Sequence, residues 1–319
     1  MIGIGARERP AALGLAALLL LLAAAAPGFY DPAALRDLLL ANAPLLIVAA
    51  GMTLVVLAGH IDVSAGAIFG VAAVIAGVLA REGVPVPAAA LAAALAGGGI
   101  GLVNGLLVTR LGLPSIVVTL AMLVILRDAL RWTTDGAWIR DLPAGFQWFG
   151  LGQDAGRLLL LAAAALIVVA VGWGLRVLGA GRALYAVGSD LESARLLGLD
   201  PDRVVLGAFT AAGLLSGLAG VLNASRFAEV PGSIPNGLEL EVIAAVVVGG
   251  AAITGGRGSM IGTGLGVALL GAIGTGLTFL GVSASWERAL QGAIILAAIL
   301  VDTVGPVRRR VARGAASHA

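Results

Sequence analysis

The sequence predicts an all-α protein, a polytopic membrane helix bundle with about ten transmembrane spans. Hydrophobic residues make up 60% of the 319 residues and charged residues only 12%, against about 45–50% and about 25% in a typical soluble protein. A soluble globule of this size cannot bury so much apolar surface in one core. Apolar runs as long as a bilayer is thick also recur along the whole chain. These observations exclude a soluble fold.

About ten segments are long and apolar enough to be spans. They are 10–28, 36–58, 63–80, 86–108, 114–133, 157–178, 203–223, 240–255, 259–280 and 287–305. The glycine-interrupted stretches, 240–255 above all, are expected to form broken or re-entrant helices. An even number of spans puts both termini on one side, and the arginines that flank the first and last spans put that side in the cytoplasm.

The chain is therefore predicted to have a cytoplasmic N-terminus (1–9), a single transmembrane domain (10–305) and a cytoplasmic tail (306–319). The first span has an alternative interpretation, because its arginines and apolar run also resemble a secretory signal. The length of the run, with Pro27 directly after it and further spans behind, favours a retained helix.

Glycines recur at intervals of four in two of the predicted spans. This spacing places them on one helix face, where another backbone can approach closely. The glycines are Gly97, Gly101 and Gly105 in one span, and Gly262 and Gly266 in the other with Gly258 directly before it. Tight packing within the bundle is the favoured interpretation, and a translocation path lined by backbone is the alternative.

Several residue types are missing, which narrows the chemistry. There is no cysteine, only two histidines (His60 and His318), and all 20 basic residues are arginine. No metal site or cofactor is therefore expected, and a P-loop lysine for ATP is impossible. The protein is predicted not to be an enzyme, so any ATP hydrolysis belongs to another chain. The net charge of +2 is carried by scattered arginines, which argues against a nucleic-acid partner.

The longest polar stretch between spans, residues 181–203, carries the signals of a complete short helix over 189–197. Ser189 is placed to cap its N-terminus, and Glu192 three residues later would complete a capping box. Gly198 can take the left-handed conformation that ends a helix. The leucines of this helix are too apolar for a solvated loop, which indicates a cytoplasmic partner or, alternatively, the bilayer surface.

Glu192-Ser-Ala-Arg-Leu-Leu-Gly198 resembles the Glu-Ala-Ala-x-x-x-Gly loop of the permease subunits of bacterial ABC importers. Further blocks that resemble the monosaccharide branch of these permeases lie at 59–66, 104–105, 113–120 and 241–259. The resemblance runs in order from about residue 40 to residue 305. Two more blocks, at 134–143 and 234–240, are more similar to the permeases for autoinducer-2 and rhamnose than to those for ribose.

This resemblance implies an ATP-driven import system in the bacterial cytoplasmic membrane. Its partners would be ABC ATPase subunits, a second permease chain that is identical or related, an extracellular solute-binding protein and membrane lipid. The solute would be a small sugar or sugar-like molecule of the autoinducer-2, rhamnose or ribose class. The resemblance also implies a coupling helix that sits in a cleft of the ATPase, formed here around Ser189, Glu192, Ala194 and Gly198.

Uncharged polar residues within the spans are candidates for the translocation path, with hydrogen bonds between packed helices as the alternative. They are Asn104, Ser115, Thr119 and Asn223. Gly249-Gly250 interrupts the helix after residue 240, and unwound backbone at membrane depth lies only beside protein or a water-filled cavity. These two glycines are therefore also candidates for the path.

Residues 59–62 are predicted to form a tight cytoplasmic hairpin between two spans. Asp62 or Ser64 would cap the helix that follows. His60 stands where the resembling family often has glycine. It could act as a proton-sensitive gate, although a single histidine at a turn is more often a structural hydrogen-bond donor.

The predicted outer loop, 133–156, is rich in aromatic residues. An interfacial aromatic belt explains this pattern, and docking of an extracellular binding protein is the alternative. A secondary transporter driven by an ion gradient is the alternative function for the whole chain. Such transporters keep ionisable groups deep in the membrane, whereas the acids here lie mostly near span ends. They are Asp62, Asp128, Glu239, Glu241, Glu287 and Asp302.

Overall fold

The computed structural model describes most of the chain. The described residues are Gly5, 7–234, 236–282, 286, 289, 292 and 293. In these ranges the protein is helical apart from its loops and one isolated antiparallel bridge between Ile139 and Val230. The predicted span 287–305 lies almost entirely outside the described residues, and the predicted tail 306–319, with His318, lies wholly outside them.

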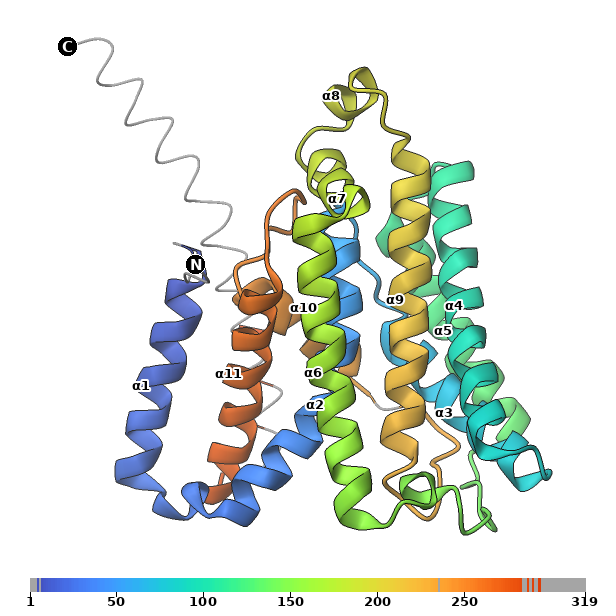
Figure 1. Cartoon of the computed structure of the whole chain (residues 1–319), viewed down its shortest axis with the longest axis vertical. Coiled ribbons are helices and arrows are strands. Elements are labelled where there is room, and N and C mark those ends of the chain that lie inside the picture. The colour runs from blue at the N-terminus through green and yellow to red at the C-terminus, as the bar shows by residue number, and fades with distance from the viewer. Residues whose placement is uncertain are drawn as a thin grey trace.

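The helices follow the predicted spans closely (Figure 1). They are α1 (Arg9–Ala25), η1 (Pro27–Tyr30), α2 (Pro32–Leu57), α3 (Ala65–Arg81), α4 (Val86–Arg110), α5 (Ser115–Thr134), η2 (Gln147–Gly150), α6 (Gln153–Val177), α7 (Gly179–Ser189), α8 (Leu191–Leu196), α9 (Pro201–Ala224), α10 (Leu238–Val248) and α11 (Met260–Phe279). Every predicted span up to 259–280 coincides with one helix, and α7 and α8 occupy the predicted loop 181–203.

Five described helices are long and apolar enough to cross a membrane, namely α2, α4, α6, α9 and α11. Helices α1 and α3 are apolar but shorter. Helix α5 carries Arg127, Asp128 and Arg131 in its second half. The helical membrane architecture is thus confirmed, whereas the described residues do not confirm about ten spans.

Two helices within the predicted spans do not extend through the whole bundle. Helix α10 has 11 residues, which is about 16 Å at 1.5 Å per residue. It ends where Gly250 takes a left-handed φ of 97°, which confirms the predicted break in 240–255. Helix α3 begins part-way through the bundle, at the end of a descending link from α2 (Figure 1).

We call α3 and α10 the two half-helices. Their first turns meet inside the protein. A Cβ placed on Gly66, in the first turn of α3, would lie 2.6 Å from Oε2 of Glu239 in the first turn of α10. A side chain at this position of α3 would therefore displace the Glu239 carboxylate. This contact brings two helix N-termini, each with a partial positive charge, to the carboxylate of Glu239.

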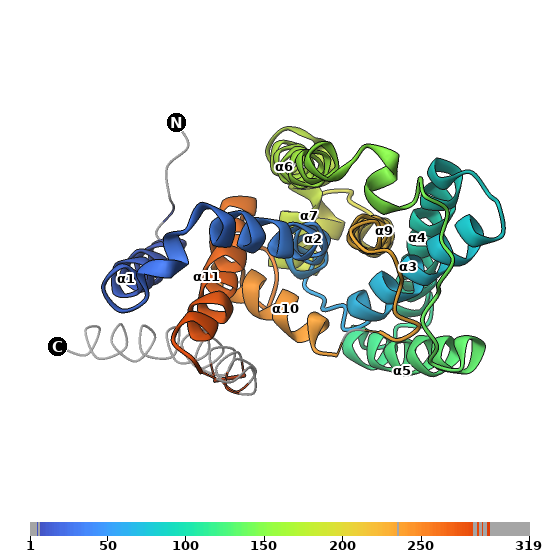
Figure 2. The same cartoon turned by 90° about the horizontal axis from the view of Figure 1, so that it is seen from below.

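Helices α4 and α9 pack through their glycines, as the spacing of four predicts. A Cβ on Gly97 would lie 2.9 Å from Cα of Gly217, and one on Gly101 would lie 3.1 Å from Cα of Gly213. Figure 2 shows this pair at one side of α2, with α10 and α11 at the other. The predicted role of these glycines in packing is confirmed.

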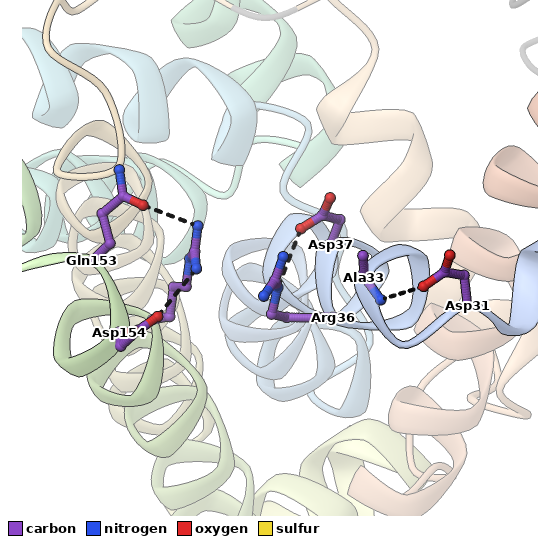
Figure 3. Close-up of polar contacts among 7 residues, drawn as sticks. Asp31, Ala33, Arg36, Asp37, Gln153 and Asp154 are labelled. Carbon is purple, nitrogen blue, oxygen red and sulfur yellow. Dashed lines mark hydrogen bonds and ion pairs between the residues drawn. The ribbon is translucent and has the colours of Figure 1, made fainter.

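The end of the bundle opposite α8 is marked by charged and capping residues where α2 and α6 begin (Figure 3). Asp31 Oδ1 accepts a hydrogen bond from Ala33 N at 3.0 Å and caps α2. Arg36 and Asp37 form an ion pair at 3.7 Å, and Arg157 pairs with Asp154 at 3.2 Å in the first turn of α6. Exposed pairs of this kind are typical of a helix end that leaves the apolar layer.

The described N-terminal residues lie at the other end, beside the loop between α10 and α11. The Ser259 hydroxyl donates a hydrogen bond to Glu8. Helix α1 packs on α11, and a Cβ on Gly276 would lie 2.9 Å from Leu22, which is fully buried. Helix α1 therefore packs as part of the bundle.

Candidate functional site

The loop that resembles a coupling helix folds as a six-residue helix, α8, closed at both ends. Asp190 Oδ1 accepts hydrogen bonds from the N–H groups of Glu192 at 3.0 Å and Ser193 at 3.2 Å. The prediction that Ser189 caps this helix, within a capping box with Glu192, is therefore wrong. Ser189 is the last residue of α7, so the next residue in the chain is the one with the extended backbone that an N-cap needs.

The C-terminal signal of α8 is confirmed. Gly198 has a φ of 79°, its N–H donates to Arg195 O at 2.9 Å, and the N–H of Leu199 donates to Ala194 O at 3.1 Å. These two bonds form a Schellman motif. The predicted helix 189–197 is thus shortened to Leu191–Leu196 but stops where the sequence indicates.

The faces of α8 have different environments. Ala194 is buried against the bundle and belongs to a core cluster that includes Leu184 and Val205. Leu196 and Leu197, by contrast, are 85% and 77% exposed. Ala194 therefore anchors α8 to its own chain, and the two leucines form an exposed apolar surface at the tip of the bundle (Figure 1).

Three backbone segments cross where α7 ends and α8 begins, and we call this crossing the joint. The segments are residues 57–59, 188–189 and 255–256. The N–H of Gly256 donates to Leu57 O at 2.9 Å. A Cβ on Gly255 would lie 2.7 Å from Cα of Gly59 and 2.8 Å from Gly188 O. No side chain fits between these segments, so the three backbones are in direct contact.

The segment that follows the joint differs from the predicted cytoplasmic hairpin. Asp62 is 1% exposed and Ser64 is fully buried, so residues 60–64 run into the bundle. Neither side chain accepts a hydrogen bond from an amide of α3, because Asp62 Oδ1 instead accepts from Ser64 N at 2.9 Å and Ser64 Oγ at 2.6 Å. The expectation of a surface hairpin with a helix cap is therefore corrected to a buried turn.

Three of the candidate path residues stabilise this buried segment, and with Asp62 and Ser64 they form what we call the polar junction. Asn104 Nδ2 donates to Ser64 Oγ at 2.8 Å. The N–H of residue 61 donates to Ser115 Oγ at 3.4 Å, and the N–H of residue 63 donates to Thr119 Oγ1 at 3.1 Å. These side chains supply the hydrogen bonds that an extended backbone lacks at membrane depth.

The remaining candidates lie elsewhere. His60 is half-buried, with its ring centroid 6.0 Å from that of Phe209, and it lines a cavity of about 380 Å³ with Ser115. Asn223 lies near the opposite end of the bundle and lines a polar cavity of about 520 Å³ with Glu241. Gly249 packs against α11 at residue 262. The structure therefore does not bring all predicted path residues into one site.

The aromatic residues in and beside the outer loop fall into two groups. Trp132 and Trp138 are exposed, as a belt or a docking surface requires. Phe146 and Trp148 are buried, and a Cβ on Gly156 would lie 2.7 Å from Cε3 of Trp148. These two residues therefore belong to the core.

Sequence reasoning missed an ionic contact inside the bundle. Arg127 of α5 lies 3.5 Å from Glu239 of α10. Asp62 and Glu239 do lie next to helix ends, as predicted, but those ends are inside the protein. The signal that could have found the pair is the placement of Arg127 inside the apolar segment 114–133, since an intramembrane charge needs a partner.

Comparison with known proteins gives the family. Residues 34–299 match the family described as branched-chain amino acid transport system / permease component. The chain is 37% identical to an autoinducer 2 import system permease protein LsrC from Photorhabdus luminescens, over 81% of this chain and 78% of that protein. It is 35% identical to the LsrC of Enterobacter sp. (strain 638), over 96% and 89%, and 37% identical to that of Yersinia pseudotuberculosis (strain IP 31758), over 81% and 74%. No solved structure matches. The chain belongs to this family of transport-system permease components and is therefore a transport permease subunit.

Proposed function

We propose that the chain is the membrane-spanning permease of an ATP-driven ABC importer that carries autoinducer-2 or a similar small, hydroxylated solute into a bacterial cell. The solute class rests on the relatives, which are autoinducer 2 import system permeases at 35–37% identity over most of the chain. We infer ATP as the energy source from α8, because this short helix holds Leu196 and Leu197 in water at the tip of the bundle. An ATPase surface that covers these leucines would remove their cost of exposure.

The complete system contains further chains. Two ATPase subunits bind at the α8 end, which is the cytoplasmic end, and the N-terminus lies there too. A second permease chain, identical or related, completes the pathway in the inner membrane. A solute-binding protein delivers the solute to the outer loop 133–156, where Trp138 and, at the edge of the loop, Trp132 are exposed. Residues 10–305 act as one membrane domain.

The joint provides the coupling mechanism. ATP-driven closure of the ATPases pushes α8, and Ala194 and the end of α7 transmit this displacement to the joint. From the joint the displacement reaches the polar junction and α3 through residues 59–64, and α10 through the loop 249–259. Both half-helices begin in the interior, so a shift of their ends changes access at the middle of the membrane and not only at its surface.

The experiment is uptake of radiolabelled autoinducer-2 into proteoliposomes that contain the permease, its co-purified ATPase and the binding protein. Uptake must require ATP inside the vesicles and continue when ion gradients are collapsed with ionophores. Uptake that runs on a proton or sodium gradient without ATP would contradict the proposal. Transport of leucine but not of autoinducer-2 would reject the solute class and keep the ATP-driven mechanism.

A further inference from the structure

The ionic contact between α5 and α10 has polar atoms that the fold leaves without partners. Arg127 Nη2 lies 3.5 Å from Glu239 Oε1, yet this contact lacks hydrogen-bond geometry. Among the described residues, Nε and Nη2 of Arg127 and Oε2 of Glu239 are buried and accept or donate no hydrogen bond. Glu239 as a whole is only 7% exposed.

An arrangement of this kind is unfavourable if its only role is structural. Each buried polar group without a hydrogen bond costs about 1–3 kcal/mol, and more if it is charged. Ionisable residues inside a membrane protein are expensive and usually functional. A purely structural pair would close into the bidentate geometry that arginine and carboxylate prefer, which this pair does not.

The surroundings of Glu239 hold its carboxylate in place. Its carboxylate lies beside the first turn of α3, where a Cβ on Gly66 would come within 2.6 Å of Oε2. It also lies in the first turn of its own helix. Two helix N-termini therefore act on the same carboxylate. On the other side, Arg127 is partly exposed at the border of the apolar face of α5, where Leu120 and Val124 are also exposed.

The unpartnered atoms define the chemistry of a ligand. The guanidinium nitrogens are donors only, and the carboxylate oxygen is an acceptor only. A hydroxyl group both accepts and donates, so adjacent hydroxyls can bind both side chains without separating them. An amino-acid zwitterion would instead have to insert a carboxylate and an ammonium into an ion pair that is already closed to 3.5 Å.

We propose that Arg127 and Glu239 form a hydroxyl-recognition site for the transported solute, with Arg127 donating to one hydroxyl oxygen and Glu239 accepting from the same or a neighbouring hydroxyl. This proposal rests on the proposed function and deepens it, because it assigns solute contacts that the predicted path residues do not provide. Two of those residues already bind the backbone of the link into α3, and Asn104 binds the Ser64 hydroxyl at the end of that link.

The test uses the purified permease–ATPase complex. Equilibrium binding of radiolabelled autoinducer-2 to this complex is measured without the binding protein, and ATP-driven uptake is then measured with it. Glu239→Gln should weaken binding and slow uptake by about tenfold or more, the loss expected for a hydrogen bond to a charged group. Assembly with the ATPase should be retained, because the variant keeps the shape of the side chain.

Two further variants separate recognition from structure. Arg127→Lys keeps the positive charge but loses the planar fork, and it should weaken binding in the same way. Asp128→Asn, the matched control, removes the neighbouring charge on α5 and should leave binding unchanged. The charge-exchanged double variant Arg127→Glu/Glu239→Arg restores an ion pair but not the recognition geometry, so it should not restore uptake.

The proposal fails if Glu239→Gln binds autoinducer-2 within about twofold of the wild type, or if the exchanged pair transports normally. It also fails if leucine displaces the bound label and ribose does not. If Glu239→Gln does not assemble, Arg127→Lys decides the question by the same binding thresholds. A wild-type complex that shows no ATP-driven uptake would instead reject the proposed function.

Discussion

The starts of the two half-helices differ in how well their polar groups are satisfied. At the start of α3, hydrogen bonds of 3.4 Å or less join Asp62, Ser64, Asn104 and the extended backbone of the polar junction. Of its buried polar side-chain atoms, only Asp62 Oδ2 and Asn104 Oδ1 have no hydrogen bond. At the start of α10, Glu239 faces a single arginine across 3.5 Å without a hydrogen bond. The start of α3 is thus a structural junction, whereas at the start of α10 the facing charged groups form no hydrogen bond with each other.

The largest effect is expected from breaking the structural junction. Asp62→Leu removes the acceptor of two hydrogen bonds from Ser64, and each buried group left unpaired costs about 1–3 kcal/mol. The folded fraction of the purified permease, measured by size-exclusion chromatography and thermal unfolding, should fall sharply. Asp62→Asn keeps an acceptor oxygen and should remain folded. Equal stability of the leucine variant and Glu239→Gln would remove the contrast between the two sites.

The next effect concerns the connection from α8 to both half-helices. Gly198→Val forces a β-branched residue into the left-handed region at φ 79°, at a cost of about 1–2 kcal/mol, and disrupts the end of α8. Uptake and ATPase co-purification should be lost while membrane insertion continues. Gly83→Val at φ 88°, in the turn between α3 and α4, introduces the same strain far from α8 and should retain uptake. If both variants transport equally, α8 is not the coupling element.

A smaller effect is expected at the edge of the polar junction. Thr119→Val keeps the shape of the side chain but removes the hydroxyl that accepts from the backbone N–H of residue 63 at 3.1 Å. Loss of this bond should lower the free energy of unfolding by about 1 kcal/mol, seen as a modest decrease in Tm. Binding of autoinducer-2 should not change, since the residue serves the fold. A selective loss of binding would place Thr119 in the solute path.

The sequence predicted much of this fold because the relevant signals are local. The break in 240–255, the glycine spacing in α4 and the end of α8 at Gly198 each depend on neighbours within a few residues. The N-cap was misplaced by one residue because both Ser189 and Asp190 can cap, and only the end of α7 decides between them. The polar junction and the pair of Arg127 with Glu239 join segments far apart in the chain, so no local pattern reveals them.

The smallest effect is expected from pH at the α8 cap. Hydrogen bonds from the Ser193 hydroxyl and N–H, and from the N–H of Glu192, hold the pKa of Asp190 below its ordinary value. A lowered carboxyl pKa means that the contribution of the cap is present above the unfolded-state value of about 4 and is lost as the pH falls through the lower folded value. ATPase co-purification should therefore be constant between about pH 5 and 8. A decline across that range that disappears in Asp190→Asn would contradict this assignment.

The measurement that tests the central claim most directly is co-purification of the chain from its native membrane in mild detergent, with mass spectrometry of the accompanying proteins. The claim is that α8 presents Leu196 and Leu197 to a cytoplasmic ATPase. The account predicts a partner with a Walker A lysine that is lost in Leu196→Glu/Leu197→Glu and retained in Leu151→Glu, the same change at an exposed leucine of the outer loop. A partner retained by the α8 variant, or a chain that transports with no partner at all, would contradict it.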